Sequence, residues 1–309
     1  MYDAHTHLVT PEVYEWLKRP RNGLDIEWQR RASSANPFLV VNQRWPFEFK
    51  PEFLSGDLYL REQETRGIVH SLISPIPQLF LYDAPSTVTT ELARVYNESL
   101  AFWCAAHPTL SGLATLPLNN PAAACRELDR AMDLGLKGAI LAPGSSRMLT
   151  HPDLVPVWQA LNDASAILFL HPLLNGDPRI QQRMMPNLIG VLWETTVAAA
   201  DLLLAGYLDQ YPKVRILLAH GGGYLPYHIG RMQKAFSLWP QARGDLSRTP
   251  HEYLRQYWFD SVVFDAQALA FLERLVGSSK IVPGSDYPFD LCIWPPHYRG
   301  RDGFHSLLS

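Results

Sequence analysis

The chain has 309 residues, of which 47% are hydrophobic and 18% are charged, and its formal net charge at neutral pH is −3. This composition is that of a folded globular protein and excludes an intrinsically disordered chain. Because lysine and arginine are not in strong excess, the composition also argues against nucleic acid as a partner.

The cysteine content and the apolar stretches of the chain indicate its cellular location. The three cysteines are widely spaced and form no CxxC motif: Cys104, Cys125 and Cys292. They suggest neither a disulfide framework nor a cysteine zinc site, and they fit a reducing compartment. The N-terminus has no basic and apolar regions of a secretion signal, and the most apolar stretch, 198–208, is too short to span a bilayer. We therefore expect a cytoplasmic protein without a membrane partner.

Short apolar segments alternate with longer segments of helical period along most of the chain, which is typical of β/α units around a parallel sheet. The predicted strands are Tyr2–His5, Ile68–Ser74, Gly112–Leu116, Gly138–Leu141, Ile167–Leu170, Val214–Ala219, Tyr257–Asp260 and Lys280–Gly284. The main predicted helices are Thr87–Ala106, Pro121–Leu134, Asp153–Asp163, Thr196–Tyr211, Leu225–Leu238 and Ala266–Val276. Eight such strands predict an α/β fold of the closed (β/α)₈ TIM-barrel type, with residues 1–309 in a single domain.

One connection is far longer than an ordinary loop of this fold, because residues 8–67 separate the first predicted strand from the second. We interpret these residues as an insertion. The insertion is rich in aromatic side chains: Trp28, Phe38, Trp45, Phe47, Phe49, Phe53 and Tyr59. Two interpretations stay open, a lid over the barrel mouth and a small satellite core packed against the side of the barrel.

Two histidines, His5 and His7, stand at the C-terminal end of the first predicted strand. Because residues two apart on a strand point to the same face, both imidazoles are expected to face the barrel interior. Active sites of such barrels lie at the C-terminal ends of the strands. The HxH motif is short and occurs by chance, so its position at the strand end carries the information.

Three more residues of the metal-ligand type follow other predicted strands. His171 follows the fifth strand, His220 the sixth and Asp286 the eighth. A single His or Asp at a strand end is usually a hydrogen-bonded polar residue without a metal. Five such residues on one rim, however, would leave buried polar groups unpaired unless a cation organised them. Imidazole nitrogen and carboxylate oxygen suit Zn²⁺, and Mn²⁺, Fe²⁺ and Co²⁺ are compatible with the same atoms.

Four motifs together resemble a known family, and they occur in the same order along the chain. They are the HxH motif at 5–7, His171-Pro172, Ala219-His220-Gly-Gly-Gly223 and Gly284-Ser-Asp-Tyr-Pro-Phe289. Shorter similar stretches are Asn42-Gln-Arg44, Trp193-Glu-Thr195 and Phe259-Asp-Ser261. The chain is similar to the amidohydrolase superfamily and, within it, to the branch of 2-amino-3-carboxymuconate-6-semialdehyde decarboxylase.

The resemblance implies a single zinc ion, with His5, His7, His171 and Asp286 as its ligands. It also implies that His220 lies close to the metal and acts as the acid/base, and His220 or Asp286 would manage the proton of the reaction. Members of the superfamily with two metals use a carboxylated lysine at the end of the fourth strand. The only nearby lysine here, Lys137, precedes that strand, so one metal is expected.

The glycines at 221–223 permit two interpretations. A tight turn into a helix exposes backbone N–H groups that can hold an anion, and glycine is also needed where a strand and a helix pack closely. For the substrate, the resemblance places Arg44 at a position that binds a carboxylate, which suits guanidinium, although most arginines are solvated surface residues. Trp193 and Phe289 are candidates for the pocket wall, although large aromatic residues belong more often to the core.

The C-terminal segment 291–309 differs from the family and shows no helical period. The sequence therefore does not predict the helix that should cover the eighth strand.

These features predict a metal-dependent, non-oxidative decarboxylase, a carboxy-lyase, acting on a small carboxylated muconate-type or aromatic acid. The same metal and His220 are equally suited to adding water, so a hydrolase or hydratase acting on a C–C bond, a lactone or an amide is the alternative. A third reading is a catalytically inactive barrel that binds a ligand or a subunit. The expected partner is the small carboxylic acid, and a homodimer stays open.

Overall fold

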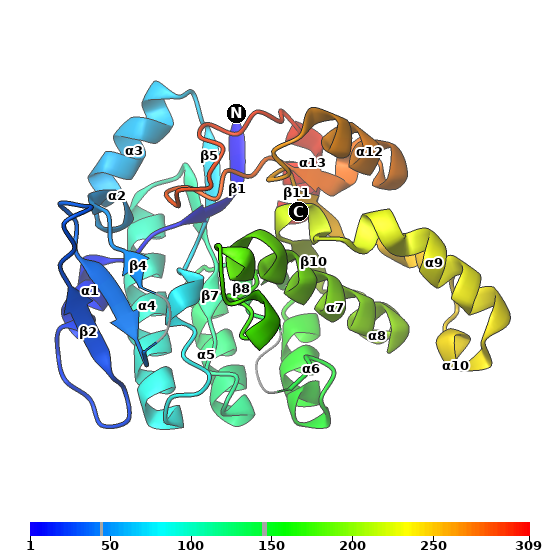
Figure 1. Ribbon diagram of the computed structural model, residues 1–309, viewed down its shortest axis with the longest axis horizontal. Helices are drawn as coiled ribbons and strands as arrows, with labels where there is room; N and C mark the ends of the chain where they lie inside the picture. The colour runs from blue at the N-terminus through cyan, green and yellow to red at the C-terminus, as the bar shows by residue number, and fades with distance from the viewer. Residues whose placement is uncertain (44–45, 144–146) are drawn as a thin grey trace.

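The computed structural model describes residues 1–43, 46–143 and 147–309. It is an α/β fold in which helices surround parallel strands (Figure 1). The strands are β1 (Tyr2–His7), β5 (His70–Ser74), β6 (Leu110–Gly112), β7 (Ala114–Thr115), β8 (Gly138–Leu141), β9 (Ile167–Leu170), β10 (Arg215–Leu218), β11 (Trp258–Asp260) and β12 (Ile281–Val282). They form two parallel sheets, in the orders β1-β5-β6 and β12-β11-β10-β9-β8-β7. The prediction of an α/β fold with parallel strands is confirmed.

Backbone hydrogen bonds link the two sheets at both junctions. Leu113, the residue between β6 and β7, donates from its N–H to the carbonyl of Ile73 in β5 at 2.9 Å. At the other junction the N–H of Ala4 in β1 donates to the carbonyl of Pro283 just after β12, at 2.7 Å. The N–H of His7 likewise donates to the carbonyl of Tyr287 at 2.9 Å. These bonds bring the start of the chain beside the segment that follows its last strand.

Most predicted helices occur with small shifts of their ends. The long helices are α4 (Ser86–Ala106), α5 (Pro121–Asp133), α6 (Val155–Asp163), α7 (Val191–Leu204), α9 (Leu225–Leu238) and α12 (Ala266–Val276). The predicted helix Thr196–Tyr211 is instead α7 followed by the short helix α8 (Tyr207–Gln210), because Gly206 between them adopts a φ of 73°. The other short helices between β5 and β12 are η1 (Pro77–Leu79), η2 (Pro152–Leu154), η3 (Pro178–Ile180), η4 (Pro186–Gly190), η5 (His220–Gly222), α10 (Pro240–Arg243), α11 (Pro250–Leu254) and η6 (Ser278–Lys280).

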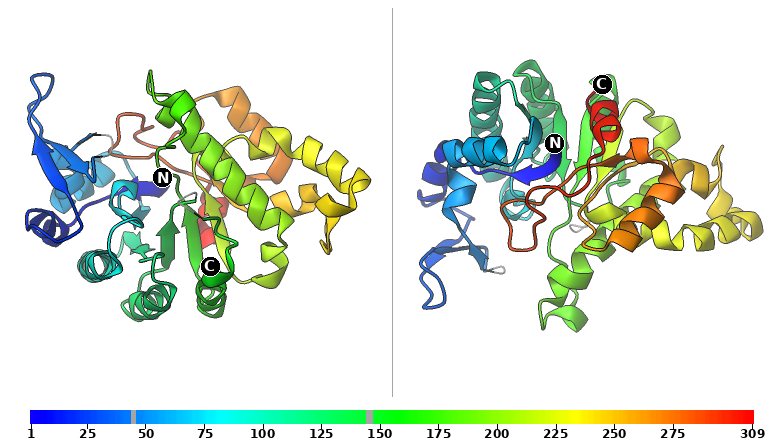
Figure 2. Two further views of the ribbon diagram at one scale, coloured as in Figure 1. Left: turned by 60° about the horizontal axis from the view of Figure 1, so that its bottom comes forward. Right: turned by 90° about the horizontal axis from the view of Figure 1, so that it is seen from above.

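The segment between β1 and β5 has secondary structure of its own. It contains α1 (Pro11–Leu17), β2 (Ile26–Gln29), β3 (Phe38–Val41), β4 (Phe47–Glu48), α2 (Pro51–Leu54) and α3 (Gly56–Thr65), and β2, β3 and β4 pair in an antiparallel sheet. Figure 2 shows this blue region and the yellow helices α9 and α10 on opposite sides of the molecule. Its apolar side chains cluster against α4, for example Val13 and Leu17 with Val88 and Leu92. That the segment is an inserted lid stays a prediction.

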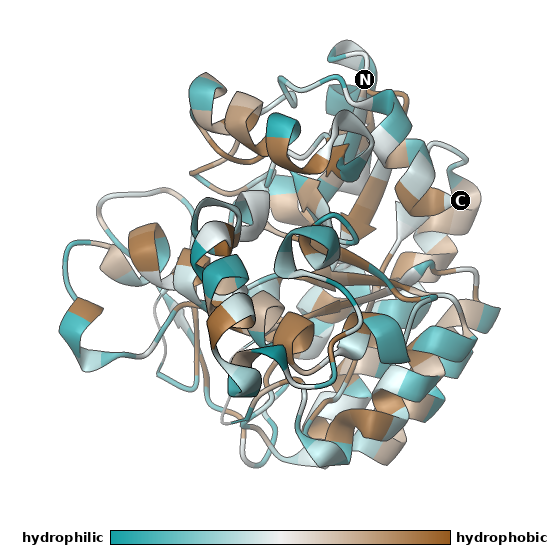
Figure 3. Cartoon of the chain, turned by 90° about the vertical axis from the view of Figure 1, so that its right-hand side faces the viewer, coloured by the Kyte–Doolittle hydropathy of each residue, from teal (hydrophilic) through white to brown (hydrophobic). Residues whose placement is uncertain are grey.

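Several parallel strands, among them β8 and β9, are apolar along their length, and Figure 3 shows such strands in brown. In β9, Ile167 and Phe169 belong to one buried cluster, whereas Leu168 and Leu170 belong to another. Alternate residues of a strand point to opposite faces, so both faces of this strand are covered by apolar groups. Such continuous apolar runs are characteristic of parallel strands buried on both sides. This core fixes the strand ends, where the candidate site lies.

The C-terminal segment forms helix α13 (Arg301–Leu308), so the expectation of a tail without a closing helix is wrong. Phe304 and Leu307 are buried in the cluster that contains Ala4 of β1 and Val282 of β12. A helix of this length has little intrinsic stability, and packing of its apolar face selects it. A helix of eight residues is too short for its apolar period to be recognised in the sequence.

One helical segment, Pro186–Leu204, is long and apolar enough to cross a membrane by length and composition alone. Ala199, Leu202 and Leu203 of this segment are completely buried in the largest apolar cluster of the protein. Core helices of soluble proteins meet the same criterion. Part of the segment therefore packs in the core, whereas Leu188, Ile189 and Leu204 are exposed.

Candidate metal centre

Five predicted site residues converge at the C-terminal ends of four strands. His5 and His7 lie in β1, His171 directly follows β9, His220 begins the turn after β10, and Asp286 lies beyond β12. All five have little exposure to solvent, and His5 and His7 have none. The strands meet at one edge because the start of the chain pairs with the segment after β12. The isolated bridge between Thr6 and Tyr287 belongs to the same pairing.

One carboxylate oxygen, Oδ1 of Asp286, lies at the centre of the cluster. The Nε2 atoms of His5, His7 and His171 are 3.1, 3.3 and 4.0 Å from this oxygen. The Nε2 atom of His220 instead lies 3.3 Å from the other oxygen, Oδ2. Three imidazoles therefore face Oδ1 of Asp286, and the fourth, that of His220, faces Oδ2 of the same carboxylate.

The atoms that face one another in this cluster are buried and unpaired. Within residues 1–43, 46–143 and 147–309, Nε2 of His5, His7 and His171 and Oδ1 of Asp286 have no hydrogen-bond partner. A buried polar group without a partner costs about 1–3 kcal/mol. Four such atoms of the metal-ligand type around one point fit a divalent cation, which would satisfy all four at once.

The opposite ring nitrogens of the three histidines are held by acceptor oxygens. Nδ1 of His5 lies 2.5 Å from Oδ2 of Asp260, Nδ1 of His7 lies 3.2 Å from the carbonyl of Pro75, and Nδ1 of His171 lies 3.0 Å from the carbonyl of Pro172. Because these oxygens only accept, each Nδ1 donates its proton. In the neutral form of each ring, Nε2 then presents a lone pair to the cluster, which is the tautomer that binds a metal.

Other potential ligands lie close enough to be weighed. His5, His171, His220 and Asp286 each offer a ligand atom within 4.8 Å of one another, and His7 stands outside this tighter group. The position of His7 Nε2, at 3.3 Å from Asp286 Oδ1, nevertheless matches that of His5. His220 directs its Nε2 to Oδ2 instead, where it has the geometry of a hydrogen bond. The distances to Oδ1 thus group His7 with His5, whereas the mutual distances of the ligand atoms group His220 with His5 instead, and the choice of His7 as the ligand stays a prediction.

Burial and charge set the protonation of the cluster. Burial lowers the pKa of His7 and His171, so both are neutral near pH 7. Burial also lowers the pKa of His5, but the charge of Asp286 and the hydrogen bond to Asp260 outweigh it and raise that pKa to about 10. Burial raises the pKa of Asp286, but the charge of His5 and the hydrogen bond with His220 hold it well below its ordinary value. A proton on His5 and a bound cation therefore compete for the same place.

Asp260 at the end of β11 is a functional residue that the sequence analysis missed. Its carboxylate accepts the Nδ1–H of His5 and the backbone N–H groups of His220 and Gly221, the last two at 2.8 Å. Burial raises the pKa of Asp260, but these hydrogen bonds and the nearby imidazoles lower it below its ordinary value. Asp260 stood at the end of a predicted strand, as His171 and His220 do, so the same signal was present.

Asp3 is a second buried carboxylate that the sequence analysis passed over. It accepts the backbone N–H of His5 at 3.1 Å and the hydroxyl of Ser285 at 2.6 Å. Burial raises the pKa of Asp3 to about 7, although these hydrogen bonds oppose the rise. Asp3 lies two residues before His5 and therefore on the same face of β1, which is the signal that was available. It ties β1 to the segment that carries Asp286.

The backbone is strained at two site residues. His220 and Asp286 have φ values of 54° and 62°, a region that non-glycine residues rarely adopt. Such conformations cost about 1–3 kcal/mol and are concentrated at functional sites. They direct both side chains toward the cluster.

The glycines at 221–223 form the tight turn that follows His220. All three have positive φ, and a Cβ on Gly223 would lie 2.3 Å from the carbonyl oxygen of Leu192 in α7. The N–H of Gly221 donates to Asp260, that of Gly222 to Ala219 and that of Gly223 to His220. Because all three amides have partners inside the protein, close packing accounts for these glycines and anion binding does not.

The predicted substrate residues have different positions. Phe289 lies at the cluster, with its ring centroid 5.2 Å from that of His7 and 5.1 Å from that of Phe53. Trp193 is half-buried in α7, beside the guanidinium of Arg179 at 5.6 Å, and its described contacts do not include the cluster. Arg44 lies outside the residues that the structure describes.

Comparisons with known proteins agree with this geometry. A family model described as "Amidohydrolase" matches residues 2–304. The chain is similar to the 2-amino-3-carboxymuconate-6-semialdehyde decarboxylase of Dictyostelium discoideum, with 32% identity over 298 residues that cover 94% of this chain and 82% of the relative.

The fold is also similar to solved structures. The IDCase of Metarhizium anisopliae in its apo form has a TM-score of 0.81 and 26% identity, over 93% of this chain and 84% of the other. A dihydroxybenzoic acid decarboxylase of Polaromonas sp. JS666, with bound manganese and the inhibitor 2-nitroresorcinol, has a TM-score of 0.71 and 26% identity, over 79% and 78% of the two chains. Together with the cluster of unpaired ligand atoms, the manganese in that relative supports a divalent metal here.

Proposed function

Because this chain belongs to the amidohydrolase family, we propose that it is a metal-dependent, non-oxidative decarboxylase of a small carboxylated aromatic or muconate-type acid. The observation that carries the proposal is the convergence of three imidazole Nε2 atoms on one buried carboxylate oxygen, all unpaired in the described structure. The similarity to two proteins named as decarboxylases selects this reaction from those that such a site supports.

We also propose that the parallel strands close into a (β/α)₈ barrel of one domain. The bonds from Leu113 to Ile73 and from Ala4 and His7 to the segment after β12 support closure, because they join the two sheets at both edges. The three cysteines are free, which supports the proposal of a cytoplasmic location. A homodimer stays a prediction.

The proposed metal is one Zn²⁺ ion held by His5, His7, His171 and Asp286. Three imidazole nitrogens and one carboxylate oxygen are ligands typical of zinc, whereas manganese prefers more oxygen ligands. Manganese, iron and cobalt are the alternatives, and the Polaromonas relative holds manganese. When bound, the cation supplies positive charge that polarises a substrate oxygen. Elemental analysis of the purified protein tests the identity and the number of metal ions.

The side chains around the metal ligands supply the proton chemistry. Decarboxylation breaks the bond between the carboxyl carbon and the adjacent carbon, and the electron pair left on that carbon must receive a proton. We assign this proton to His220, whose Nε2 lies 3.3 Å from Oδ2 of Asp286 at the partly exposed side of the cluster. Asp286 orients the imidazole, and Asp260 fixes the backbone of His220 through its N–H. The pair can therefore hold a proton beside the substrate carbon.

The substrate contacts are proposals of different strength. Phe289 is assigned to the pocket wall because its ring packs against that of His7. Arg44 is assigned to a substrate carboxylate on the sequence motif alone, and Trp193 to a more distant part of the pocket wall. Replacing Arg44 by Gln is expected to raise KM about tenfold or more while changing kcat less, since a bidentate ion pair is lost.

The reaction is tested with a panel of hydroxybenzoic and muconate-type acids in H₂¹⁸O. Decarboxylation releases CO₂ and leaves an organic product without solvent oxygen. A hydrolase or hydratase incorporates ¹⁸O into the organic product. Release of CO₂ in proportion to substrate loss supports the proposal, and ¹⁸O in the product without CO₂ contradicts it.

A further inference from the structure

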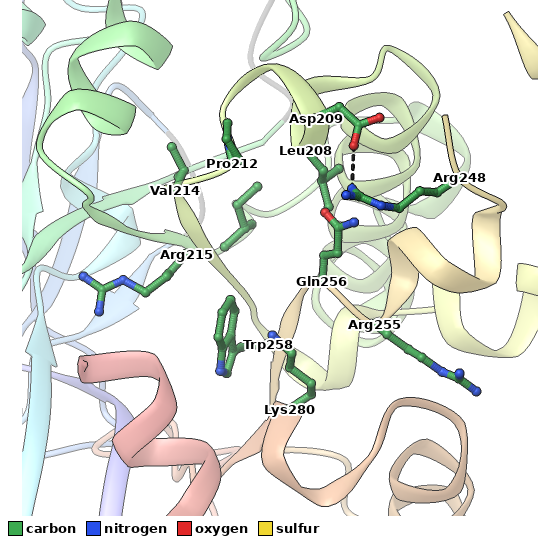
Figure 4. Close-up of a pocket in the computed structure, with 11 residues that line it drawn as sticks. Leu208, Asp209, Pro212, Val214, Arg215, Arg248, Arg255, Gln256, Trp258 and Lys280 are labelled. Atoms are coloured by element: carbon green, nitrogen blue, oxygen red, sulfur yellow. Dashed lines mark hydrogen bonds and ion pairs between the residues drawn. The ribbon is translucent and has the colours of Figure 1, made fainter. Parts of the chain in front are cut away.

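A cavity of about 360 Å³ lies at the N-terminal ends of strands β10, β11 and β12 (Figure 4). Arg215 begins β10, Trp258 begins β11 and Lys280 immediately precedes β12, and all three line this cavity. The metal ligands stand at the C-terminal ends of the strands, whereas these residues stand at the N-terminal ends. The cavity is therefore separate from the metal centre.

The polar lining of this cavity is mostly cationic. Arg215, Arg248, Arg255 and Lys280 line it, and the only carboxylate in the described lining is that of Asp209. This carboxylate is already satisfied, because it accepts a hydrogen bond from Arg248 at 2.6 Å and others from Ser247 and Tyr253. Figure 4 marks the pair of Asp209 and Arg248 with a dashed line. The described lining therefore contains four cationic side chains and one carboxylate.

Lys280 is the cation with the least compensation. Its Nζ lies 3.3 Å from the ring centroid of Trp258, and the structure gives it no carboxylate partner in the part of the chain that is described. Burial lowers its pKa to about 8, so the ammonium still carries its charge near pH 7. The contact with the indole ring fixes the side chain, but a ring quadrupole compensates less charge than a carboxylate does.

Arg215 is also half-buried without a carboxylate partner among the described residues. Its guanidinium donates to the backbone carbonyls of Leu307 at 2.7 Å and Ser165 at 2.6 Å, and burial lowers its pKa. These bonds attach α13 to the N-terminal ends of the strands, but carbonyl groups do not neutralise the positive charge of the guanidinium. The opposite wall of the cavity is apolar and includes the buried side chains of Leu208 and Val214.

We propose that this cavity binds a small organic anion, with its anionic group at Lys280 and Arg248 and its apolar body against Leu208 and Val214. The volume suits a molecule about the size of a substituted benzene ring, and small pockets of about 300 Å³ and above are typical of ligand sites. An anion beside Lys280 compensates a charge that the protein leaves half-buried. The class is that of carboxylates, sulfonates and phosphate monoesters with a compact apolar body. The inference does not depend on the proposed reaction.

The competing explanation is that these cations only hold the strand ends together. Arg215 has such a role through Leu307 and Ser165, and Arg255 donates to the carbonyl of Leu275 at 3.1 Å. Trp258 donates from its indole N–H to the hydroxyl of Ser306 at 2.9 Å, but the ammonium of Lys280 has no comparable hydrogen bond among the described residues. A purely structural role therefore predicts no saturable binding that depends on Lys280.

The experiment is a calorimetric titration of the metal-loaded full chain with benzenesulfonate, an anion on a planar apolar ring that is a weak metal ligand. We expect one saturable site that weakens with added salt, as contacts between charges do. Lys280→Met, which retains the apolar stem, is expected to weaken binding about tenfold or more. The control is Lys234→Met, at an exposed position in α9 outside the cavity, which should leave the affinity unchanged.

Arg248→Gln is the second variant, because Arg248 is exposed and its loss does not threaten the fold. It is expected to weaken binding about threefold or more, since a charged hydrogen bond is replaced by a neutral one. The variant His171→Ala, which is expected to lose its metal ion, should bind benzenesulfonate with unchanged affinity. Absence of binding, equal affinity in the wild type and both cavity variants, or loss of binding in His171→Ala would overturn the proposal.

Discussion

The two ends of the parallel strands leave different polar groups without partners. At the C-terminal ends, lone pairs of His5, His7 and His171 and an oxygen of Asp286 face one buried point without partners in the described structure. At the N-terminal ends, cations such as Lys280 line an open cavity, and the one carboxylate in its described lining, that of Asp209, is paired with Arg248. The first end suits a cation and the second an anion.

The two ends also differ in how rigidly the charged groups are held. Each imidazole at the metal centre is fixed by an acceptor on its opposite nitrogen, for example Asp260 for His5 and Pro172 for His171. The ammonium group of Lys280 has a single described contact, with the ring of Trp258. A fixed set of lone pairs selects an ion by geometry, as metal sites do, whereas a flexible ammonium selects mainly by charge. Substitutions at the metal centre should therefore have the larger effects.

The largest effect is expected from replacing a metal ligand. His171→Ala removes one of the four proposed ligands, and we expect the purified protein to lose its metal on dialysis and its decarboxylase activity to fall below detection. Elemental analysis and CO₂ release measure the two losses. His228→Ala, at an exposed position in α9, is the matched control and should retain both. Full metal content in His171→Ala would contradict the proposed ligand set.

Replacing His220 separates catalysis from metal binding. We expect His220→Ala to retain its metal ion while kcat falls about 10²- to 10⁴-fold, because a positioned acid/base contributes that much. The measurement is the rate of CO₂ release by protein whose metal content has been verified. A variant that loses the metal would make His220 a ligand, as its place in the tighter group of four residues also permits. An unchanged rate would contradict the assignment of His220 as the acid/base.

Asp260→Asn tests the support of the metal centre rather than a ligand. The change leaves an acceptor near Nδ1 of His5 but removes the charge that polarises the ring, and we expect metal affinity to fall about 10- to 100-fold. Competition with a chelator measures this loss. A structural role alone would lower thermal stability and leave the chelator titration of the folded protein unchanged, which is the outcome that contradicts the assignment.

The metal centre was predictable because its members share one local pattern. His171, His220 and Asp286 each follow a short apolar segment, and parallel strands in a β/α fold end at the same edge. Asp260 has the same pattern and lies in a stretch that resembles the family, but it was not assigned a role in the site. The sequence cannot distinguish a carboxylate that binds the metal from one that orients a histidine, since the difference is one of distance.

Other features depend on contacts between distant segments. Helix α13 exists because Phe304 and Leu307 pack against β1 and β12, and eight residues carry too little periodicity to reveal it. The role of the glycines at 221–223 was likewise decided by the approach of Leu192 and the carboxylate of Asp260. The charge pattern at the N-terminal ends of the strands is spread over residues 209–280 and has no local motif.

The smallest effect is a dependence of stability on pH at the N-terminal ends of the strands. Burial lowers the pKa of Lys280 from its ordinary value of 10.5 to about 8 in the folded protein. Between these two values the unfolded chain binds the proton more tightly, so the folded state gains stability as pH rises through this window. The penalty for the buried charge is fully present below about pH 8. Lys280→Met removes it and keeps the apolar contact with Trp258.

We therefore expect Lys280→Met to have a higher free energy of unfolding than the wild type at about pH 7, and the difference to shrink toward about pH 10. The difference should be modest, because a side chain that is only half-buried is partly screened by solvent. Urea unfolding of both proteins at the two pH values measures it, and Lys234→Met should show no such trend because its side chain is exposed. A difference that is the same at both pH values would mean that Lys280 carries no uncompensated charge, and the contrast between the two ends of the strands would fail.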